Sequence, residues 1–417
     1  MKAGTTVLTL AQQSEMLALR QLYMRKLEVH MAETPPGAEM AVRDKIAACI
    51  IGAISMENTP AGISIHRSSP RTRAQLADPA FDFPSATPSG VRIDAITTAE
   101  WIEVDLALTR FRMLGESLHA TSVDLIVDGE LRPSLPITST TVISADRAGR
   151  GMTVERAVPQ TLRFDLGRSG VDRRVEIWLP HAAAAVLVDA RLPEGATLRR
   201  TEQTDRVWAH YGSSISHCSE VERPTQTWPA IVARRSGHSL INLGLGGQCH
   251  LDQGMARTIR DLNADAISLE IGINIAGGDT MRERTFTSAF HGFLDTVREG
   301  AHDAPILIIS PIYCRALEDN PGPVYWDAEG AMHATERPES LLPGTLSLTR
   351  VRELLTQHVA IRREDGDKNL HLLNGLDLFG ADDSGDLPDD LHPNTNGYAR
   401  IAKRMYPVAF GEKGVLR

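Results

Sequence analysis

Residues 207–216 read Val-Trp-Ala-His-Tyr-Gly-Ser-Ser-Ile-Ser, a short apolar run that ends in glycine and is followed directly by serines. An apolar run of this length indicates a buried β-strand, and the glycine marks the turn at its end. Four further runs of this kind occur at 239–245, 266–271, 306–310 and 371–374. Strands separated by helical segments are typical of βαβ units and of a parallel sheet.

Amphipathic segments lie between these runs, at 225–236, 252–263, 281–300 and 349–363. The third of them places its phenylalanines at helical spacing, which indicates a helix with one buried face. Residues 201–417 are therefore predicted to form an α/β domain with a doubly wound, five-stranded parallel sheet of the flavodoxin-like kind.

The first 200 residues have a different sequence pattern. Residues 8–32 and 38–56 carry apolar side chains among arginines and lysines and are predicted to be helical, so that 1–60 would be an N-terminal helical segment. Beyond it, short alternating segments separated by turn residues such as Asp-Gly indicate antiparallel strands. Residues 61–200 are predicted to form a jelly-roll-like β-sandwich domain.

The composition limits the classes of partner. The chain has 417 residues, a formal net charge of −9 and a pI near 5.9, which argues against nucleic acid and anionic membranes as partners. No apolar run reaches the roughly 20 residues of a membrane span. No signal peptide is visible, so a cytoplasmic protein is expected. A homo-oligomer is left open.

Polar residues follow several of the predicted strands. Because ligands bind at the carboxyl ends of parallel strands, these residues are expected to meet at one edge of the sheet. Ser214 follows the first strand, Gly246 and Gly247 follow the second, and Asn274 follows the third. After the fifth comes Asp-Asp-Leu-His-Pro-Asn at 389–394, which places an acid and a base on one short loop.

The order Ser, Gly, Asn and His across four strand ends resembles the SGNH hydrolases, also called GDSL-type esterases and lipases. The resemblance covers residues from about 205 to 410, and its last block, 389–394, is the most specific. A β-sandwich ahead of such a domain is similar to the arrangement in two-domain carbohydrate esterases. The resemblance implies a serine esterase that needs no cofactor and no metal.

The resemblance also implies roles for individual residues. Ser214 would be the nucleophile, His392 the general base and Asp389 the acid that orients it. The oxyanion hole would be formed by the backbone N–H groups of Ser214 and Gly247 and by the side chain of Asn274. A serine hydroxyl becomes a good nucleophile when a base lies within hydrogen-bond reach, and aligned donors stabilise the developing oxyanion.

The sequence departs from the family pattern in ways that leave alternatives open. The usual Gly-Asp-Ser-Leu is here Gly-Ser-Ser-Ile, which makes Ser213 a rival nucleophile, and Gln248 stands where Asn or Asp is frequent. Gly246 could replace Gly247 in the oxyanion hole. Asp390 could compete with Asp389, although the spacing to the histidine favours Asp389.

Three histidines and two cysteines near the strand ends could be drawn as a metal site, but their spacing matches no known ligand pattern. They are His210, His217, His250, Cys218 and Cys249. The four cysteines are scattered and do not indicate a disulfide framework. In a 2-1-3-4-5 strand order Cys218 and Cys249 would come close, so a disulfide between them is a minor hypothesis.

A long irregular stretch from Cys314 to about Ser347 interrupts the α/β pattern, and loops of this length usually cover a site or make an interface. Its Tyr325 and Trp326 are candidates for substrate binding. Trp228 could also line a pocket, but core packing is at least as good an explanation.

The leading hypothesis for function is hydrolysis of short-chain acyl esters, above all acetyl esters, of a carbohydrate or small glycoside. This step rests on architecture alone. The alternatives are an arylesterase, a thioesterase or an acyltransferase that acts on a small metabolite through the same triad. A non-catalytic binding or assembly protein is the remaining reading, and the intact set of Ser214, Asp389 and His392 argues against it.

Overall fold

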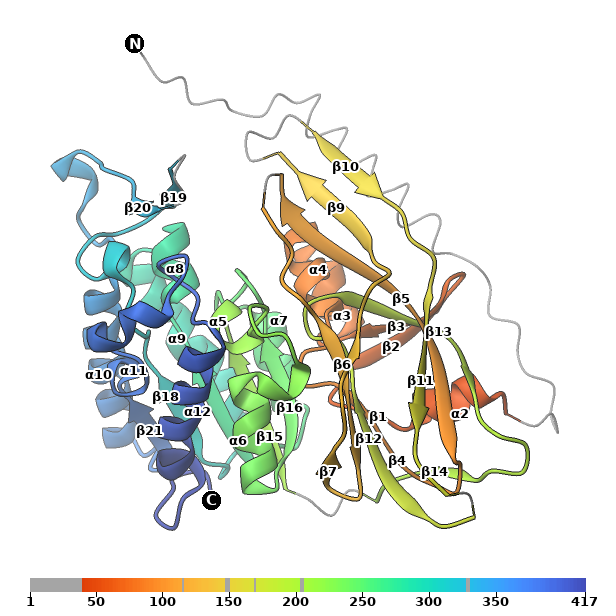
Figure 1. Ribbon diagram of the computed structural model, residues 1–417. Coiled ribbons are helices and arrows are strands. Elements are labelled where there is room, and N and C mark those ends of the chain that lie inside the picture. The colour runs from red at the N-terminus through yellow and green to blue at the C-terminus, as the bar shows by residue number, and fades with distance from the viewer. Residues whose placement is uncertain (1–39, 115, 147–150, 169, 203–205, 328–330) are drawn as a thin grey trace.

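The computed structural model describes residues 40–417 apart from 115, 147–150, 169, 203–205 and 328–330. The helix predicted over 8–32 lies outside the described residues. Two parts lie side by side in Figure 1, with the strand-rich first part on the right and the α/β part on the left.

The predicted five-stranded parallel sheet is confirmed, and its strand order is β16-β15-β17-β18-β21, the 2-1-3-4-5 order. The first strand of the α/β part, β15, therefore lies inside the sheet, and its carboxyl end lies where the winding changes direction, the usual place for a ligand in such sheets. The strands of this sheet are β15 (Val207–Gly212), β16 (Ser239–Gly244), β17 (Ala266–Glu270), β18 (Ile306–Ile309) and β21 (Leu370–Leu373).

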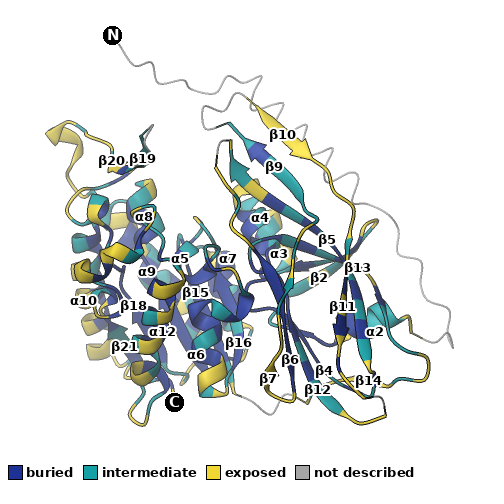
Figure 2. Cartoon of the chain, viewed as in Figure 1, coloured by how far each residue is buried: buried dark blue, intermediate teal, exposed yellow. Residues whose placement is uncertain are grey.

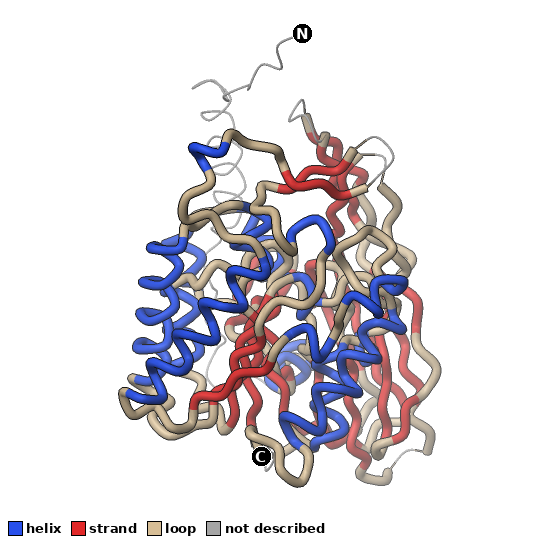
Figure 3. Tube along the Cα trace, turned by 90° about the vertical axis from the view of Figure 1, so that its left-hand side faces the viewer, coloured by secondary structure: helices blue, strands red, loops and turns tan. Residues whose placement is uncertain are grey.

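Helices lie on both sides of this sheet (Figure 3). One group packs α6 on α12, and the other packs α9 on α7 and α10. The phenylalanines of α9 are fully buried, as their spacing predicts. The α-helices are α5 (Ser214–His217), α6 (Trp228–Ser236), α7 (Gln253–Arg260), α8 (Ile273–Gly278), α9 (Glu283–Arg298), α10 (Leu348–Glu364), α11 (Gly375–Leu378) and α12 (Thr395–Phe410).

The first part of the chain contains two seven-stranded sheets, whose strands pair antiparallel except for β5 with β9. Alternate side chains of each sheet point into one shared apolar core, as Val104 of β5 and Val175 of β12 illustrate. The first sheet comprises β1 (Ile50–Ile51), β4 (Arg92–Thr97), β6 (Ser122–Val127), β7 (Glu130–Leu131), β8 (Leu135–Pro136), β12 (Arg173–Trp178) and β14 (Leu198–Arg200). The second comprises β2 (Ser55–Thr59), β3 (Gly62–His66), β5 (Trp101–Met113), β9 (Thr141–Ala145), β10 (Met152–Glu155), β11 (Gln160–Asp165) and β13 (Ala184–Arg191).

The helix predicted over 38–56 is wrong in its extent. Among the described residues of that span only α2 (Val42–Ala48) is helical; β1 follows within the span, and β2 begins there. The apolar residues of β1 pair with the edge of β4, so long-range strand pairing overrides the local helical pattern. Two short helices that were not predicted, α3 (Pro70–Leu76) and α4 (Pro79–Ala86), follow β3.

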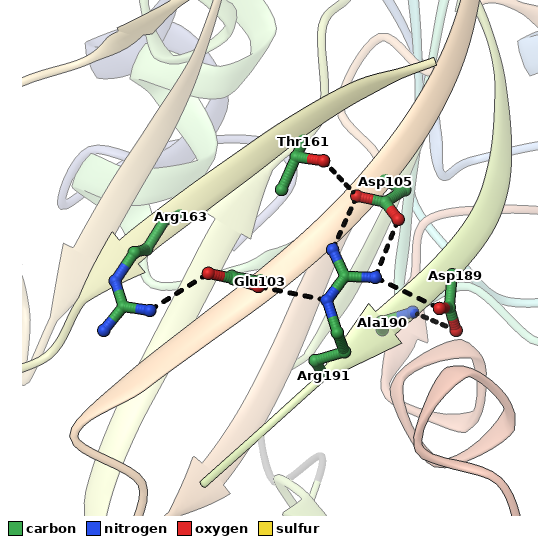
Figure 4. A network of polar contacts seen from close by, with 7 residues as sticks. All are labelled: Glu103, Asp105, Thr161, Arg163, Asp189, Ala190 and Arg191. Carbon is green, nitrogen blue, oxygen red and sulfur yellow. Dashed lines mark hydrogen bonds and ion pairs between the residues drawn. The ribbon is translucent and has the colours of Figure 1, made fainter.

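The second sheet carries an ion-pair network on β5, β11 and β13 (Figure 4). Arg191 of β13 bonds to Asp105 and Glu103 of β5, and it also contacts Asp189 of its own strand. Arg163 of β11 bonds to the same Glu103 from the other side. The hydrogen bonds from Arg191 hold the pKa of Asp105 and the pKa of Glu103 below their usual values. The network therefore ties three neighbouring strands together.

The two parts share buried surface. Figure 2 shows dark-blue, buried residues along the strands of both parts. Phe81, Ile126 and Trp178 come from the first part but pack in the core cluster of the α/β part. The irregular stretch predicted after Cys314 contains a small hairpin, β19 (Val324–Trp326) with β20 (Met332–Ala334), which projects at the top left of Figure 1. Among the described helices, none is long and apolar enough to cross a membrane.

Candidate active site

Ser214 and His392 meet at the carboxyl edge of the parallel sheet. Ser214 is the first residue of α5, directly after the turn that ends β15, and His392 lies on the loop that leads into α12. The Ser214 Oγ atom is 2.8 Å from the His392 Nε2 atom. The Nδ1 atom of the same ring is 2.7 Å from the Asp389 Oδ2 atom. The structure thus brings all three predicted residues into one hydrogen-bonded chain.

The loop geometry separates Asp389 from its neighbour Asp390. The Asp389 carboxylate bonds to the His392 ring, and its second oxygen accepts hydrogen bonds from the backbone N–H groups of Leu391 and His392, at 3.1 and 2.7 Å. Asp390 instead adopts a positive φ of 64°, and its backbone N–H donates to the carbonyl of Leu387. The sequence preference for Asp389 agrees with this geometry.

The charges around His392 favour its protonated form. Burial lowers the pKa of His392, but the negative charge of Glu220, the hydrogen bond to Asp389 and the charge of Asp389 together raise it to about 9. Burial raises the pKa of Asp389, while its bonds to His392 outweigh that effect and lower it to about 2. With Asp389 accepting from Nδ1–H, the neutral ring leaves Nε2 free to take the serine proton.

Glu220 was not predicted from the sequence. It follows Ser214 by six residues, and its Oε2 atom accepts a 2.7 Å hydrogen bond from the buried Tyr398 hydroxyl of α12. Among the effects that raise the pKa of His392, the negative charge of Glu220 is the largest. A single acid in a polar loop gives no motif, so only the fold reveals that this carboxylate lies near the base.

The rival nucleophile Ser213 has a different role in the structure. Its backbone N–H and its Oγ atom both donate to the Glu270 Oε2 atom, at 2.8 and 2.6 Å, and the Oγ atom also accepts from the backbone N–H of Ile215. Ser213 is fully buried and caps α5. Its hydroxyl is thus engaged beneath the loop, whereas the Ser214 hydroxyl reaches His392.

Glu270, at the end of β17, is the centre of a buried polar network that the sequence analysis missed. The same Oε2 atom accepts from the Ser216 hydroxyl at 3.1 Å, and Ser216 in turn lies 2.7 Å from His210 Nε2. Burial raises the pKa of Glu270. Gly212 is required here, because an added Cβ would lie 2.3 Å from the Ser216 Oγ atom. In the sequence, the signal that could have indicated this network is Glu270 itself, a charged residue within an apolar strand.

The histidines and cysteines that the sequence offers as possible metal ligands have other partners. His210 lies between Ser268 and Ser216, and His217 Nε2 contacts Thr87 Oγ1 and the carbonyl of His181. Within the described part of the chain, no group of three or more His, Cys, Asp or Glu side chains could hold a metal ion. The Cys218–Cys249 disulfide is wrong: all four cysteines are buried free thiols, and the two thiols donate separately to the carbonyls of Ile215 and Glu270.

The residues predicted for the oxyanion hole follow the carboxyl ends of β15, β16 and β17. Asn274 lies on α8, and its Oδ1 atom accepts a 3.0 Å hydrogen bond from the Cys249 backbone N–H, which fixes the orientation of the amide. Gly247 is exposed and has a φ of +71°, a conformation that favours glycine. Gly246 is the nearer to the nucleophile, since a Cβ built on it would lie 3.9 Å from the Ser214 Cβ atom. The choice between Gly246 and Gly247 therefore stays open.

The aromatic residues divide into core and surface. Trp228 is buried, and its indole N–H donates to the carbonyl of Ile215, so it supports the turn after Ser214 from inside the core. Tyr325 is half exposed on the projecting hairpin and stacks on His333, and Trp326 is half-buried on the same strand. Their role in substrate binding stays a prediction.

The comparisons with known proteins bear on the family and the fold. The sequence model of the GDSL-like lipase/acylhydrolase family matches residues 210–400. Among curated proteins, none is detectably similar to the chain. The structure is similar to a salicylyl-acyltransferase from a tetracycline biosynthetic pathway, with a TM-score of 0.71 and 27% identity over 88% of this chain and 96% of that one.

Two further solved structures share the fold. A GDSL-like lipase from Bacteroides ovatus has a TM-score of 0.60 and 20% identity over 86% of this chain and 94% of that one. A family two carbohydrate esterase from Clostridium thermocellum, solved with cellohexaose, has a TM-score of 0.52 and 14% identity over 82% and 95% of the two chains. Residues 210–400 thus match the GDSL-like lipase/acylhydrolase family, and this match supports a carboxylic ester hydrolase of the SGNH superfamily.

Proposed function

We propose that the protein is a serine esterase that removes short acyl groups, above all acetyl, from a carbohydrate or small glycoside. Ser214 is the nucleophile, His392 the base and Asp389 its support. The observation that carries the proposal is the continuous chain from Ser214 Oγ through both ring nitrogens of His392 to Asp389, with distances of 2.8 and 2.7 Å.

The chemistry follows from this chain of contacts. His392 Nε2 takes the hydroxyl proton as Ser214 Oγ attacks the ester carbonyl, and the imidazolium later protonates the leaving alcohol. Asp389 stabilises that imidazolium and keeps the ring oriented. Water, activated by the same histidine, then hydrolyses the acyl-enzyme. Backbone donors at Ser214 and Gly247 and the Asn274 amide bind the oxyanion of each tetrahedral intermediate.

We assign the sugar-ester preference from the architecture of the whole chain. The two sheets, which include β1 and β2 ahead of the predicted span 61–200, are proposed to form a jelly-roll-like β-sandwich domain ahead of the catalytic domain at 201–417, as their shared apolar core supports. The fold shared with the family two carbohydrate esterase extends over most of both chains. An oligosaccharide ester or small glycoside ester is the proposed substrate, with Tyr325 and Trp326 as candidate contacts.

A second candidate is acyl transfer to a small metabolite. The similarity to the salicylyl-acyltransferase favours it, because at 27% identity it extends over both parts of the chain. Hydrolysis and transfer share the acyl-enzyme and differ only in whether water or another acceptor attacks it. An aromatic acyl donor would then be preferred over acetyl.

One panel of substrates separates these candidates. Purified protein is assayed with acetylated saccharides, aryl esters and acyl thioesters, and product release is compared with that of Ser214→Ala. Acetate release from the saccharides by the wild type alone supports the proposal. The sugar-ester assignment fails if the saccharides are untouched while aryl esters or thioesters turn over. The serine mechanism fails if Ser214→Ala retains wild-type turnover.

A further inference from the structure

Arg67, which follows β3 in the first part of the chain, reaches into the α/β part at the strand that precedes the glycines Gly246 and Gly247. Its side chain is fully buried. One terminal nitrogen, Nη1, donates to the carbonyl of Asn242, at 3.0 Å, and to that of Gly244. These two carbonyls lie at the end of β16. A residue outside the catalytic domain therefore holds the end of β16, which leads directly into the loop with Gly246 and Gly247.

The remaining donors of Arg67 are also used. Nη2 donates to the Pro84 carbonyl at 2.8 Å and to Thr87 Oγ1 at 3.2 Å, and Nε donates to the Thr87 carbonyl. Each of the five N–H bonds of the guanidinium thus meets an oxygen. In the described residues no carboxylate forms an ion pair with Arg67, and burial lowers its pKa to about 9.

A buried cation without a counter-ion is costly unless its donors are all satisfied. Arg67 therefore fixes the positions of its acceptors, because the loss of one contact would leave a buried N–H group unpaired. Three of the five bonds go to Pro84 in the last turn of α4 and to Thr87 directly after this helix, and two go to β16. The guanidinium joins these two segments as a rigid fork.

The same loop of the first part also contacts the helix that carries the nucleophile. The Ser89 hydroxyl donates to the His217 carbonyl on α5, and it accepts from the side-chain amide of Asn242 at 3.0 Å. That amide donates a second bond to the carbonyl of Ser216. The loop around Thr87 and Ser89 is therefore bonded to both segments on which Ser214 and the glycines depend.

We propose that Arg67 is a positioning residue for catalysis: it holds the end of β16 so that the backbone N–H groups at Gly246 and Gly247 face the oxyanion formed at Ser214. The first part of the chain then contributes to the rate of the chemical step and not only to the recognition of a substrate. This inference rests on the proposed esterase function, in which those glycines supply an oxyanion donor.

The test compares Arg67→Lys and Arg67→Met with Arg73→Met as a matched control. Arg73 is a partly buried arginine six residues away, and the three partners of its side chain, Ser55, Ser68 and Glu57, all belong to the first part. Turnover of p-nitrophenyl acetate is measured and divided by the concentration of active sites, which is obtained by titration with a serine-reactive phosphonate. This normalisation removes any effect of partial unfolding.

For Arg67→Met we expect kcat per titrated site to fall by about 100-fold, the scale of losing an oxyanion donor or of a 1 Å misplacement, with KM within about threefold of wild type. Arg67→Lys retains the charge but not the fork, so a fall of about tenfold is expected. Arg73→Met should keep the wild-type kcat. A wild-type kcat per site in Arg67→Met would overturn the inference.

A second measurement separates this inference from the function on which it rests. Backbone amide hydrogen exchange over residues 242–250 is compared between wild type and Arg67→Lys, and faster exchange in the variant is expected. If the wild type cleaves no ester, the proposed function fails. The exchange experiment still shows whether Arg67 holds residues 242–250 in position. Unchanged exchange would contradict the role of Arg67. If Arg67→Met does not fold, Thr87→Val replaces it, because it removes one acceptor of the guanidinium and is expected to lower kcat without changing KM.

Discussion

The Nε2 atom of His392 lies 2.8 Å from the Oγ atom of Ser214, although 178 positions of the chain separate the two residues. The α/β fold creates this contact by bringing the end of its first strand and the loop before its last helix to the same edge of the sheet. Through this contact the two side chains act together in one catalytic step.

Replacement of His392 by alanine should lower kcat for p-nitrophenyl acetate by about three orders of magnitude or more, because Ser214 then lacks a base. The double variant Ser214→Ala/His392→Ala should lose no more than the worse single variant, since the two groups serve one step. Steady-state kinetics of the three proteins check this. Losses that multiply in the double variant would contradict a shared step.

The pH dependence of kcat/KM should report His392. Its pKa of about 9 means that the neutral, proton-accepting ring becomes abundant only as the pH approaches 9, so kcat/KM should rise up to that region. The charged ring favours the folded state below its unfolded pKa of about 6.5, and this contribution is lost as the pH rises through about 9.

Glu220→Gln should lower the apparent pKa of His392 and thereby increase activity at pH 7, because the negative charge that favours the imidazolium is removed. The shift is measured from pH–rate profiles of wild type and variant. Glu222→Gln serves as control, because Glu222 is not among the groups that shift the pKa of His392. Superimposable profiles for Glu220→Gln and wild type would refute the assignment.

Glu270→Gln should destabilise the turn that presents Ser214. One buried oxygen of Glu270 accepts three hydrogen bonds from Ser213 and Ser216, and a neutral amide oxygen accepts such bonds less strongly than a carboxylate does. We expect the free energy of unfolding to fall by about 1–3 kcal/mol, the scale of hydrogen bonds to a charged group, together with a lower kcat. Urea unfolding and kinetics measure the two effects. An equally stable variant would show that the network is dispensable.

Arg191→Ala should weaken the first part of the chain most at neutral pH. Arg191 holds the pKa values of Asp105 and Glu103 below normal, so its stabilisation is complete above their unfolded pKa near 4 and is lost as the pH falls below it. The gap between wild type and variant in urea midpoint should therefore narrow from pH 7 to pH 3. Arg199→Ala, which breaks an exposed pair with Asp172, should show no such gap. A gap that is constant with pH would contradict the ion-pair explanation.

The sequence predicts those features whose signals are local. The five apolar runs of the α/β part give the strands, and the block around His392 gives the acid and the base, because each lies within a few residues. The helix predicted over 38–56 is wrong in its second half because β1 there pairs with the distant strand β4 and β2 pairs with β3. Local pattern does not reveal such pairing.

The residues that the sequence analysis missed all act across the fold. Arg67, Glu220 and Glu270 are single charged residues in unremarkable surroundings, and their partners lie tens to hundreds of positions away, apart from the bonds that Arg67 makes within its own part. A motif requires a fixed spacing along the chain, which tertiary contacts of this kind do not have.

The packing of Trp178 and Phe81 in the core of the α/β part bears on how this enzyme could be shortened. A fragment that starts after residue 200 would lack these two aromatic rings, and the apolar residues that they cover would be exposed to water. Exposed apolar surface of that kind promotes aggregation. A shortened protein, or a fusion to another protein, should therefore keep the contact between the two parts and alter the chain at exposed loops instead.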